Sequence, residues 1–345
     1  MTFPERAAAR VEAALPDDLV PHLAAHAREA DLVVEAESRS ELVVTLPRAR
    51  VALARDAAGL SVSVEAGDPA TLHHVREYLL YLLDHVSPGV SGAMVWTGDI
   101  RRDAAPLNLH AATVRAVRRV APSFLRVELD CPGTRALSEG KGMHFSLLLP
   151  PPGRAPVWPR LDGDGRTVWP AGADSLHRAV YTFVALDPEA GRFTFDLFEH
   201  EGGRATGWAR AAQGGEVVGA MGPGSGDFPE GDEMLLAGDE TALPAIRRIL
   251  ENSPPDRSGE VFLEVARAAD ACEMRRPDAM TLTWVVRERG ETLWDHLRDR
   301  PAPRSASRFV WIAAEQALVR KAKARFRAEL GVGARESYIA YYWTA

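Results

Sequence analysis

The chain has 345 residues, of which 46% are hydrophobic, so it is long enough for two or three domains with separate cores. Its formal net charge of -7 argues against a general affinity for nucleic acid or for an anionic membrane surface. Cys131 and Cys272 match no metal-binding or redox spacing, and no apolar run suits a signal peptide or a membrane span. We therefore expect a cytoplasmic protein that binds neither nucleic acid nor a membrane.

The first 90 residues predict a small α+β domain, to which the sequence assigns no activity. Apolar periodicity predicts helices over residues 4–15 and 17–30 and short strands after them. Asp68 and Pro69 then provide a cap and a first-turn proline for a helix with one apolar face. The expected strands cover residues 32–35, 41–46, 50–55 and 60–65.

Histidines gather in this domain, at positions 22 and 26 and at positions 73, 74 and 85. Two histidines four residues apart on a helix can bind a metal ion. No carboxylate or cysteine pattern accompanies them, so solvated surface histidines explain them better, and we expect no metal site.

Residues 91–108 are rich in turn-forming and charged residues and predict a linker. From residue 109 the apolar period changes to two, and six short strands predict a closed antiparallel barrel over residues 109–230. A proline-rich stretch over residues 150–174 interrupts the barrel and should lie on the surface. The expected strands cover residues 110–120, 124–129, 143–149, 178–186, 192–200 and 216–221.

Two clusters within this barrel could hold a cofactor. A flavin needs an aromatic or apolar face, a hydrogen-bonding group near its redox-active nitrogen and a positive charge for its pyrophosphate, which Tyr181, Thr182 and Arg178 could supply. The glycine-rich stretch of residues 200–209 enters a helix near Ala205 and would expose backbone amides to a phosphate. On the residues alone both signals are weak, because such strands and glycine turns are common.

Residues 231–345 alternate strands with helices, which predicts a doubly wound α/β domain with a five-stranded parallel sheet. The expected strands cover residues 234–237, 260–265, 282–287, 309–313 and 338–342. The expected helices cover residues 242–251, 268–274, 291–299 and 316–330.

The first strand, turn and helix of this domain carry its most informative residues. Gly238 permits a sharp turn, and Asp239, Glu240 and Thr241 offer side-chain oxygens to cap the helix that follows. Open α/β sheets bind ligands at the carboxyl ends of such strands. Because no G-x-G-x-x-G is present, the residues alone slightly favour a well-capped helix without a ligand.

The string AGDETALPAI at residues 237–246 closely resembles the signature of the siderophore-interacting protein family. These are FAD-binding ferric-siderophore reductases of the ferredoxin–NADP reductase superfamily. The resemblance implies the strand order 3-2-1-4-5 for the parallel sheet, as in ferredoxin reductases. The resemblance extends over residues 109–343, while residues 1–90 resemble a small uncharacterised α+β domain found alone or ahead of such proteins. Further matches are Tyr181-Thr182, His200, Ala205, Thr206, Trp208, Ala209, the segment from Trp311 to Glu315, and the aromatic end at Trp343.

The chain also departs from the family pattern. Arg178 lies three residues before Tyr181 rather than two, so on a regular strand its side chain points away from the tyrosine face unless a bulge intervenes. Arg204 replaces a proline beside the glycine-rich turn and could restore the missing charge. Ser146, Val184 and Ala314 stand where the family has lysine, arginine and glycine.

The resemblance implies a reductase that passes electrons from NADPH or NADH through FAD to Fe(III) in a ferric siderophore, with no side chain acting as acid, base or nucleophile. Two alternatives stay open: a binding protein on a degenerate reductase scaffold, and a flavin reductase with another electron acceptor. Implied cofactor-binding residues are Arg178, Tyr181, Thr182, His200, Arg204, Ala205, Thr206, Trp208, Gly238, Asp239, Glu240, Thr241, Ala314, Glu315 and Trp343.

Overall fold

The computed structural model describes residues 3–29, 32–46, 48–139, 142–224 and 228–344, which fall into two compact units. The first unit comprises Met1–Leu107 together with Val157–Gly172, and the second comprises Asn108–Pro156 together with Ala173–Ala345. None of the helices in the described part of the chain has the length and apolar character needed to cross a bilayer.

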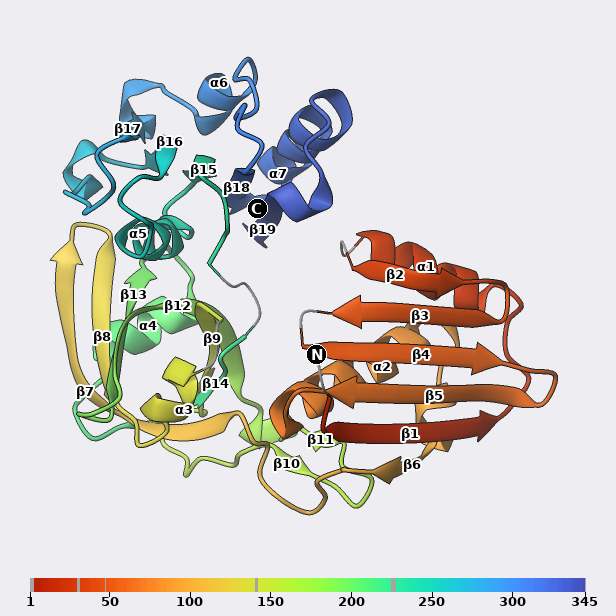
Figure 1. Cartoon of the computed structure of the whole chain (residues 1–345). Helices are drawn as coiled ribbons and strands as arrows, with labels where there is room; N and C mark the ends of the chain where they lie inside the picture. Colours follow the sequence, from red (N-terminus) through yellow and green to blue (C-terminus); the bar gives the residue numbers. More distant parts are fainter. Residues whose placement is uncertain (1–2, 30–31, 47, 140–141, 225–227, 345) are drawn as a thin grey trace. The chain divides into compact units, whose positions relative to one another are not determined.

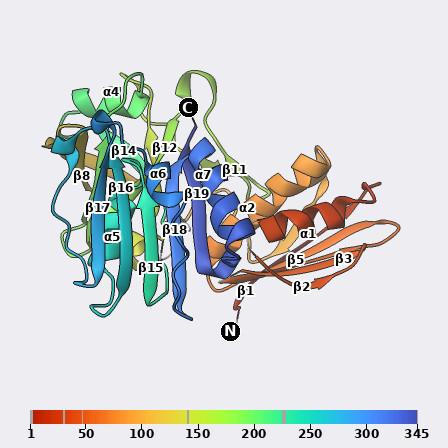
Figure 2. The ribbon, with the colours of Figure 1, turned by 90° about the horizontal axis from the view of Figure 1, so that it is seen from above.

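The first unit is an α+β layer. Its six-stranded antiparallel sheet has the order β2-β3-β4-β5-β1-β6, and α1 (Leu19–Glu29) and α2 (Pro69–Val86) cover one face (Figures 1 and 2). The Asp68 carboxylate accepts a hydrogen bond from the Thr71 amide, which starts α2 as predicted. Ala30, the last residue of the helix predicted over residues 17–30, lies outside the described residues. The strands are β1 (Glu5–Glu12), β2 (Val33–Glu37), β3 (Glu41–Leu46), β4 (Ala49–Arg55), β5 (Gly59–Ala66) and β6 (Val95–Gly98).

The first element corrects the sequence prediction, because residues 4–15 were expected to be helical and instead contain strand β1. Ala7, Ala9 and Val11 are buried at every second position, and β1 pairs with both β5 and β6. Alanine at positions 7, 8 and 9 hides this period of two and favours a helix locally. Pairing on both edges of the strand overrides that local preference.

Two segments that the sequence placed elsewhere, in the linker over residues 91–108 and in the barrel domain, belong to this unit. Residues 90–98 overlap the predicted linker and form the 3₁₀ turn η1 (Val90–Ala93) and the strand β6. The middle of the proline-rich excursion forms the hairpin β10 (Arg160–Leu161) and β11 (Thr167–Val168). Leu161 is only 1% exposed, and its amide donates to the Ala104 carbonyl at 2.7 Å. The hairpin is therefore a packed part of the first unit rather than a surface loop.

The second unit begins with the closed six-stranded barrel that the sequence predicted, in the order β12-β13-β8-β7-β14-β9. Phe145, Phe183, Phe193 and Phe195 fill its centre in stacked and edge-to-face pairs. Short helices α3 (Thr134–Glu139) and α4 (Arg204–Ala211) join its strands. The strands are β7 (Leu109–Ala121), β8 (Phe124–Asp130), β9 (His144–Leu149), β12 (His177–Asp187), β13 (Arg192–Phe198) and β14 (Val217–Met221).

The parallel sheet of the second unit has the order β17-β16-β15-β18-β19, which is the predicted 3-2-1-4-5 (Figure 2). Met234 and Leu236 pack with α5 on one face, whereas Leu235 and Ala237 pack with α6 and α7 on the other. The strands are β15 (Glu233–Gly238), β16 (Ser258–Val265), β17 (Met280–Val286), β18 (Arg308–Glu315) and β19 (Ser337–Trp343); the helices are α5 (Leu243–Glu251), α6 (Leu293–Leu297) and α7 (Gln316–Lys323).

Two predicted helices of this part differ from the structure. Residues 268–274 form only the 3₁₀ turn η3 (Ala268–Asp270), because the segment after it has no continuous apolar stripe and buries mainly Met274 and Pro277. The last helix changes after Lys323 into the π-helical segment η5 (Ala324–Glu329).

Candidate functional site

The glycine-rich turn before α4 presents free backbone donors. Gly203 is the N-cap residue, and a Cβ at this position would lie 2.7 Å from His200 Nε2 and 2.9 Å from Thr206 Oγ1. The His200 ring therefore packs over the turn, and the His200 amide donates to Thr206 Oγ1 at 3.3 Å. The first amides of a helix have no intrahelical acceptor, so those of Arg204, Ala205 and Thr206 are available to an anion.

A cavity of about 820 Å³ lies beside this turn. Arg204 and Trp208 of α4 line it together with His177 of β12 and the proline run at residues 150–152. Trp208 Nε1 donates to Glu216 Oε2 at 3.2 Å, which fixes the indole. Burial and, after it, the charge of Arg204 lower the pKa of His177. The cavity thus combines apolar walls with two guanidinium groups, of which that of Arg154 is paired with Asp174.

Strand β12 places the residues of the first cluster on opposite faces. Its register against β9 is continuous from His177 to Thr182, and its irregularity comes later, between Phe183 and Ala185. No bulge therefore turns Arg178 toward the face of Tyr181. Arg178 and Val180 share the outward face, where Val180 is 64% exposed.

Tyr181 instead packs against the barrel core, with its ring centroid 4.8 Å from that of Phe195. Burial raises the pKa of the Tyr181 phenol. The apolar surface in phase with Arg178 is therefore Val180 rather than Tyr181. In the family the tyrosine lies two residues after the arginine. The residue two positions after Arg178 in this sequence is Val180, so the spacing alone could have identified it as the residue on the same face.

A second, smaller cavity of about 170 Å³ lies beside Thr182, further along β12 than His177 and the first cavity. Thr182 lines it from the barrel, and Trp311, Tyr338 and Tyr342 line it from the parallel sheet. The Trp311 and Tyr338 rings are stacked at 5.4 Å, and Tyr342 meets Trp311 edge-on at 6.3 Å. Since His177 and Thr182 line different cavities, about 17 Å of extended strand connects the two.

The turn after β15 holds a buried carboxylate. Asp239 is 5% exposed and accepts hydrogen bonds from the Thr241 amide at 2.9 Å and from Trp343 Nε1 at 2.8 Å. Burial raises the pKa of Asp239, and these hydrogen bonds oppose that rise. The Asp239 carboxylate therefore ties the end of β15 to the end of β19, a contact that the sequence did not predict.

The expected roles of the surrounding residues need correction. The N-cap of α5 is Ala242, and no side chain caps the helix; the Asp239 backbone carbonyl accepts from the Ala242 amide at 3.0 Å. Gly238 has no positive φ. A Cβ at Gly238 would lie 2.5 Å from Ala242 Cβ and 2.9 Å from the Ala313 carbonyl oxygen, so close packing explains this glycine.

Glu240 joins three strand ends. Its buried carboxylate pairs with Arg287, accepts from the Ala266 amide at 2.6 Å, and is 3% exposed as a residue. Arg287 also binds Glu264 Oε1 at 2.7 Å. Burial raises the pKa of Glu240, and Arg287 opposes that rise. These bonds hold the carboxyl ends of β15, β16 and β17 together.

The last expected residues lie at the end of β18 and β19. Ala314 is 1% exposed and pairs with Tyr341. Glu315 is the N-cap of α7, and its carboxylate accepts from the amides of Ala317 at 2.6 Å and Leu318 at 3.3 Å. Trp343 and Tyr341 keep 43% and 57% of their surface exposed, so the chain ends in an accessible aromatic surface.

This donor set fits FAD. The free amides of α4 and the Arg204 guanidinium suit a pyrophosphate, and the cavity beside them has the size of a cofactor site. Along the outward face of β12, Val180 offers exposed apolar surface and Thr182 offers a hydroxyl. The aromatic end of β19 adds a flat surface for a ring system.

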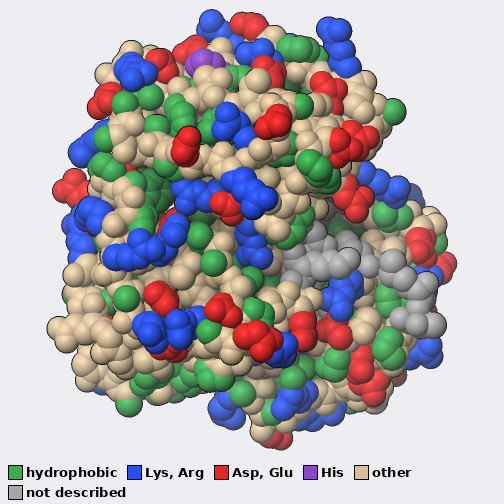
Figure 3. Space-filling model, turned by 60° about the vertical axis from the view of Figure 1, so that its left-hand side comes forward, with side chains coloured by type: hydrophobic (Ala, Val, Ile, Leu, Met, Phe, Trp, Pro, Cys, Tyr) green, Lys and Arg blue, Asp and Glu red, His purple; other side chains and the backbone are tan. Residues whose placement is uncertain are grey.

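A third cavity, of about 390 Å³, lies between the end of β7, β8 and α5. Four arginines and two aspartates line it, together with Cys272. On this face Lys and Arg side chains surround a hollow (Figure 3). It is separate from the outward face of β12, because β7 and β8 form the opposite wall of the closed barrel.

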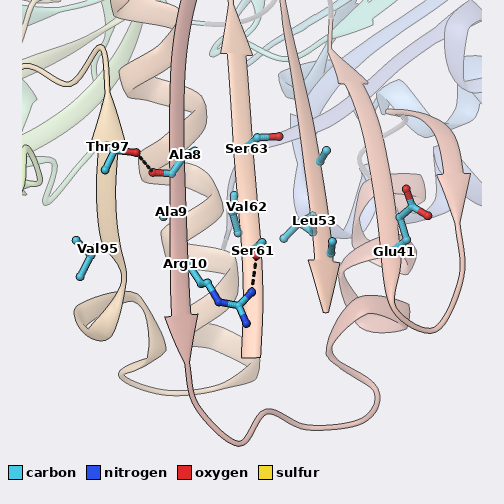
Figure 4. A pocket seen from close by; sticks show the side chains of 12 residues that line it. Ala8, Ala9, Arg10, Glu41, Leu53, Ser61, Val62, Ser63, Val95 and Thr97 are labelled. Atoms are coloured by element: carbon cyan, nitrogen blue, oxygen red, sulfur yellow. Dashed lines mark hydrogen bonds between the residues drawn. The ribbon is translucent and has the colours of Figure 1, made fainter. Parts of the chain in front are cut away.

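The first unit carries a shallow hollow of about 500 Å³ on the open face of its sheet (Figure 4). Small side chains such as Ala8, Ser61 and Ser63 line it, and Arg10 donates to Ser61 Oγ at 2.8 Å. We assign no chemistry to this face. Across the described ranges, no three or more His, Cys, Asp or Glu side chains are arranged to hold a metal ion. His26 instead bonds Tyr78 at 2.9 Å, and His73 bonds Thr167 at 3.1 Å.

Comparison with known proteins identifies the family. Residues 113–227 match the model of the siderophore-interacting FAD-binding domain, and residues 231–345 match the siderophore-interacting protein model. The ferric vibriobactin reductase of Vibrio cholerae is 30% identical over 236 residues, which cover 65% of this chain and 85% of that protein. The chain belongs to the siderophore-interacting protein family.

Two solved structures and one curated protein are also similar to this chain. A siderophore utilization protein from T. fusca has a TM-score of 0.61 and 30% identity, covering 71% of this chain and 95% of that one. The siderophore-interacting protein SipS from Aeromonas hydrophila has a TM-score of 0.57 and 25% identity, covering 71% and 100%. The mycobactin import ATP-binding/permease protein IrtA of Mycolicibacterium thermoresistibile is 29% identical over 258 residues, 68% of this chain; the match spans only 25% of that relative.

Proposed function

We propose that this protein is a flavin-dependent reductase that uses NADH or NADPH to reduce Fe(III) in a ferric siderophore, in the cytoplasm. Membership of the siderophore-interacting protein family and the FAD-binding domain model support the flavin. The reductase activity of the Vibrio cholerae relative supports the reaction class. The siderophore and the choice between the two nicotinamides are open to experiment.

One observation carries the proposal: strand β12 runs between two cavities of complementary character, with His177 at one and Thr182 at the other. The cavity at His177 has the cation and free amides suited to a pyrophosphate, and the cavity at Thr182 has a wall of aromatic rings. Val180 lies exposed between them. An elongated cofactor with a charged middle and a flat ring matches this arrangement.

A bound FAD would supply hydride acceptance and single-electron donation, which no side chain can supply. The chain's own residues bind and orient. Arg204 and the α4 amides neutralise phosphate charge, which is expensive to bury uncompensated. Val180 and the aromatic end at Trp343 provide apolar surface, and the Thr182 hydroxyl provides a hydrogen bond. The bonds of Asp239 and Glu240 keep the strand ends of the parallel sheet in place.

The test begins with the visible spectrum of the purified full-length chain. We expect flavin absorbance, or quenching of added FAD fluorescence with a micromolar dissociation constant, about 8 kcal/mol of binding free energy. Under anaerobic conditions, NADH and NADPH should then bleach the flavin, and a ferric siderophore should restore its colour while an Fe(II)-specific dye reports released iron. A protein that neither binds FAD nor releases Fe(II) would refute the proposal.

A second candidate function rests on a specific observation. Ser146, which stands where the family has lysine, pairs directly with Val180 across β9 and β12, so a small polar side chain lies beside an exposed apolar one on the outward face. Such a face could hold a siderophore without electron transfer, as a binding protein on a reductase scaffold. Tight siderophore binding by a colourless protein would favour this candidate. Flavin bleaching that is reoxidised by quinones but by no ferric siderophore would favour a reductase with another acceptor.

A further inference from the structure

The lining of the cavity between β7, β8 and α5 has four arginines and only two aspartates. Arg118 of β7 stands directly opposite Arg126 of β8 in the antiparallel register, and Arg126 stands opposite Asp196 of β13. Like charges directly opposite one another on paired strands destabilise a sheet. Arg247 of α5 approaches the same carboxylate, with Nη1 3.4 Å from Asp196 Oδ2. Three guanidinium groups therefore surround one buried aspartate.

The hydrogen-bond and ion-pair partners of Arg118, Arg126 and Arg247 do not neutralise all three guanidinium groups. Arg126 binds Asp196 through two bonds of 2.7 and 2.8 Å, and no other carboxylate binds Arg126 or Arg247 within the described part of the chain. The second aspartate in the lining, Asp270, uses both oxygens on the amide and hydroxyl of Ser123, each at 2.8 Å. Across the described ranges the Arg118 side chain has neither hydrogen bond nor ion pair.

The two innermost cations are partly desolvated. The side chains of Arg126 and Arg247 are 22% and 18% exposed, and that of Asp196 is 3% exposed. Charge in such a setting is screened less than at the open surface, so an unbalanced guanidinium is costly there. A bound anion would remove that cost. Guanidinium groups offer planar pairs of N–H donors that match phosphate oxygens.

We propose that this cavity is a binding site for the phosphate group of a small molecule. Its volume of about 390 Å³ suits a small phosphate ester as well as the free ion. Arg118, Arg126 and Arg247 contact the phosphate oxygens, and Arg119 of the same lining is already neutralised by Glu199. The site lies on the barrel wall opposite β12, so it is independent of the proposed flavin surface.

Cys272 provides a reporter inside the cavity. Its Sγ accepts a hydrogen bond from Arg247 Nη2 at 2.9 Å, and the thiol is partly exposed. The other cysteine, Cys131, is fully buried. In the folded chain a neutral alkylating agent therefore reacts with Cys272 alone, and a ligand that fills the cavity slows that reaction.

The experiment measures phosphate binding by calorimetry and the alkylation rate of Cys272 by iodoacetamide, on the full chain at constant ionic strength set with chloride. We expect one saturable phosphate site and a several-fold slower alkylation when it is filled. Arg118→Ala, an exposed position, should weaken phosphate binding about fivefold or more. The control is Arg275→Ala, which removes an exposed arginine three residues from Cys272 that does not line the cavity, and it should leave binding unchanged.

Adenosine monophosphate is titrated in parallel, to distinguish an ester from the free ion. Tighter binding than inorganic phosphate assigns the site to an ester, and equal or weaker binding assigns it to the free ion. The proposal is overturned if phosphate does not bind, if bound phosphate leaves the alkylation rate unchanged, or if Arg118→Ala and Arg275→Ala weaken binding equally. Because flavin is not involved, these outcomes do not depend on the proposed reductase activity.

Discussion

The hydrogen bond between Trp343 and Asp239 allows a prediction about stability and pH. Trp343→Phe keeps an aromatic side chain but removes the indole donor that lies 2.8 Å from the buried Asp239 carboxylate. A hydrogen bond to a charged acceptor contributes about 1.5–3 kcal/mol. Because Trp343 is 43% exposed, we expect the lower end, about 1.5 kcal/mol, which corresponds to a Tm lower by about 2–3 °C.

The stability lost in Trp343→Phe should depend on pH, and the direction of that dependence follows from the pKa of Asp239. Burial raises the pKa of Asp239 in the folded chain, and the bond from Trp343 lowers it. A carboxyl group whose pKa is raised by folding favours the folded state below its unfolded pKa, about 3.9, and this contribution disappears as the pH rises through the folded pKa. Trp343 stabilises only the charged form appreciably. Trp343→Phe should therefore cost more at pH 7.5 than at pH 4.5.

Thermal unfolding of flavin-free protein, followed by calorimetry at both pH values, tests this reasoning. Asp239→Asn removes the titrating group and retains an acceptor, so in that background the effect of Trp343→Phe should be smaller and independent of pH. Tyr341→Phe changes an exposed neighbour on β19 and serves as the control, with an expected effect within about 0.5 kcal/mol. A Trp343→Phe penalty that is equal at both pH values would show that the charged hydrogen bond is not its cause.

Three further predictions concern the cofactor surface and the first unit. Arg204→Ala should weaken FAD binding about tenfold or more, and Arg178→Ala less; FAD titrations that show the reverse order contradict the phosphate assignment. Val180→Asp should also weaken FAD binding about tenfold or more while leaving the Tm nearly unchanged, because the side chain is 64% exposed and an added charge opposes both the ring and the phosphates. A chain beginning at Asn108 should be insoluble, because residues 157–172 lose the unit they pack in, whereas replacing those residues by a short glycine-serine linker should restore solubility; equal solubility of both chains would contradict this.

The sequence predicted those elements whose apolar period was unambiguous. The six barrel strands and the five parallel strands are confirmed, because alternating and continuous apolar runs distinguish the two kinds of sheet. The order of the parallel strands, which the resemblance to ferredoxin reductases implied, is confirmed as well. The same reasoning failed for β1, where alanine stands on both faces and carries no period. The strand β6 and the β10–β11 hairpin belong to the first unit because they contact residues that are distant in the sequence. A local apolar pattern cannot predict such contacts.

The sequence predicted which residues belong to the candidate site better than it predicted what each residue contacts. The motif at residues 237–246 located the turn that holds Asp239 and Glu240, but it suggested helix capping. The structure shows contacts to Trp343 and Arg287, more than 40 residues away in the sequence. On β12 the one-residue shift of Arg178 was visible in the sequence. Only the continuous register against β9 shows that Val180, and not Tyr181, shares its face.

The chain passes between the two units three times, after Leu107, after Pro156 and after Gly172. A domain joined by one linker can be gained or lost in evolution through a single recombination event. Here the first unit is incomplete without a hairpin encoded inside the barrel, so its gain required a matching insertion between β9 and β12. Among siderophore-interacting proteins, we therefore expect a long insertion at this point to occur together with the N-terminal domain, and a short connection to occur in proteins that lack it.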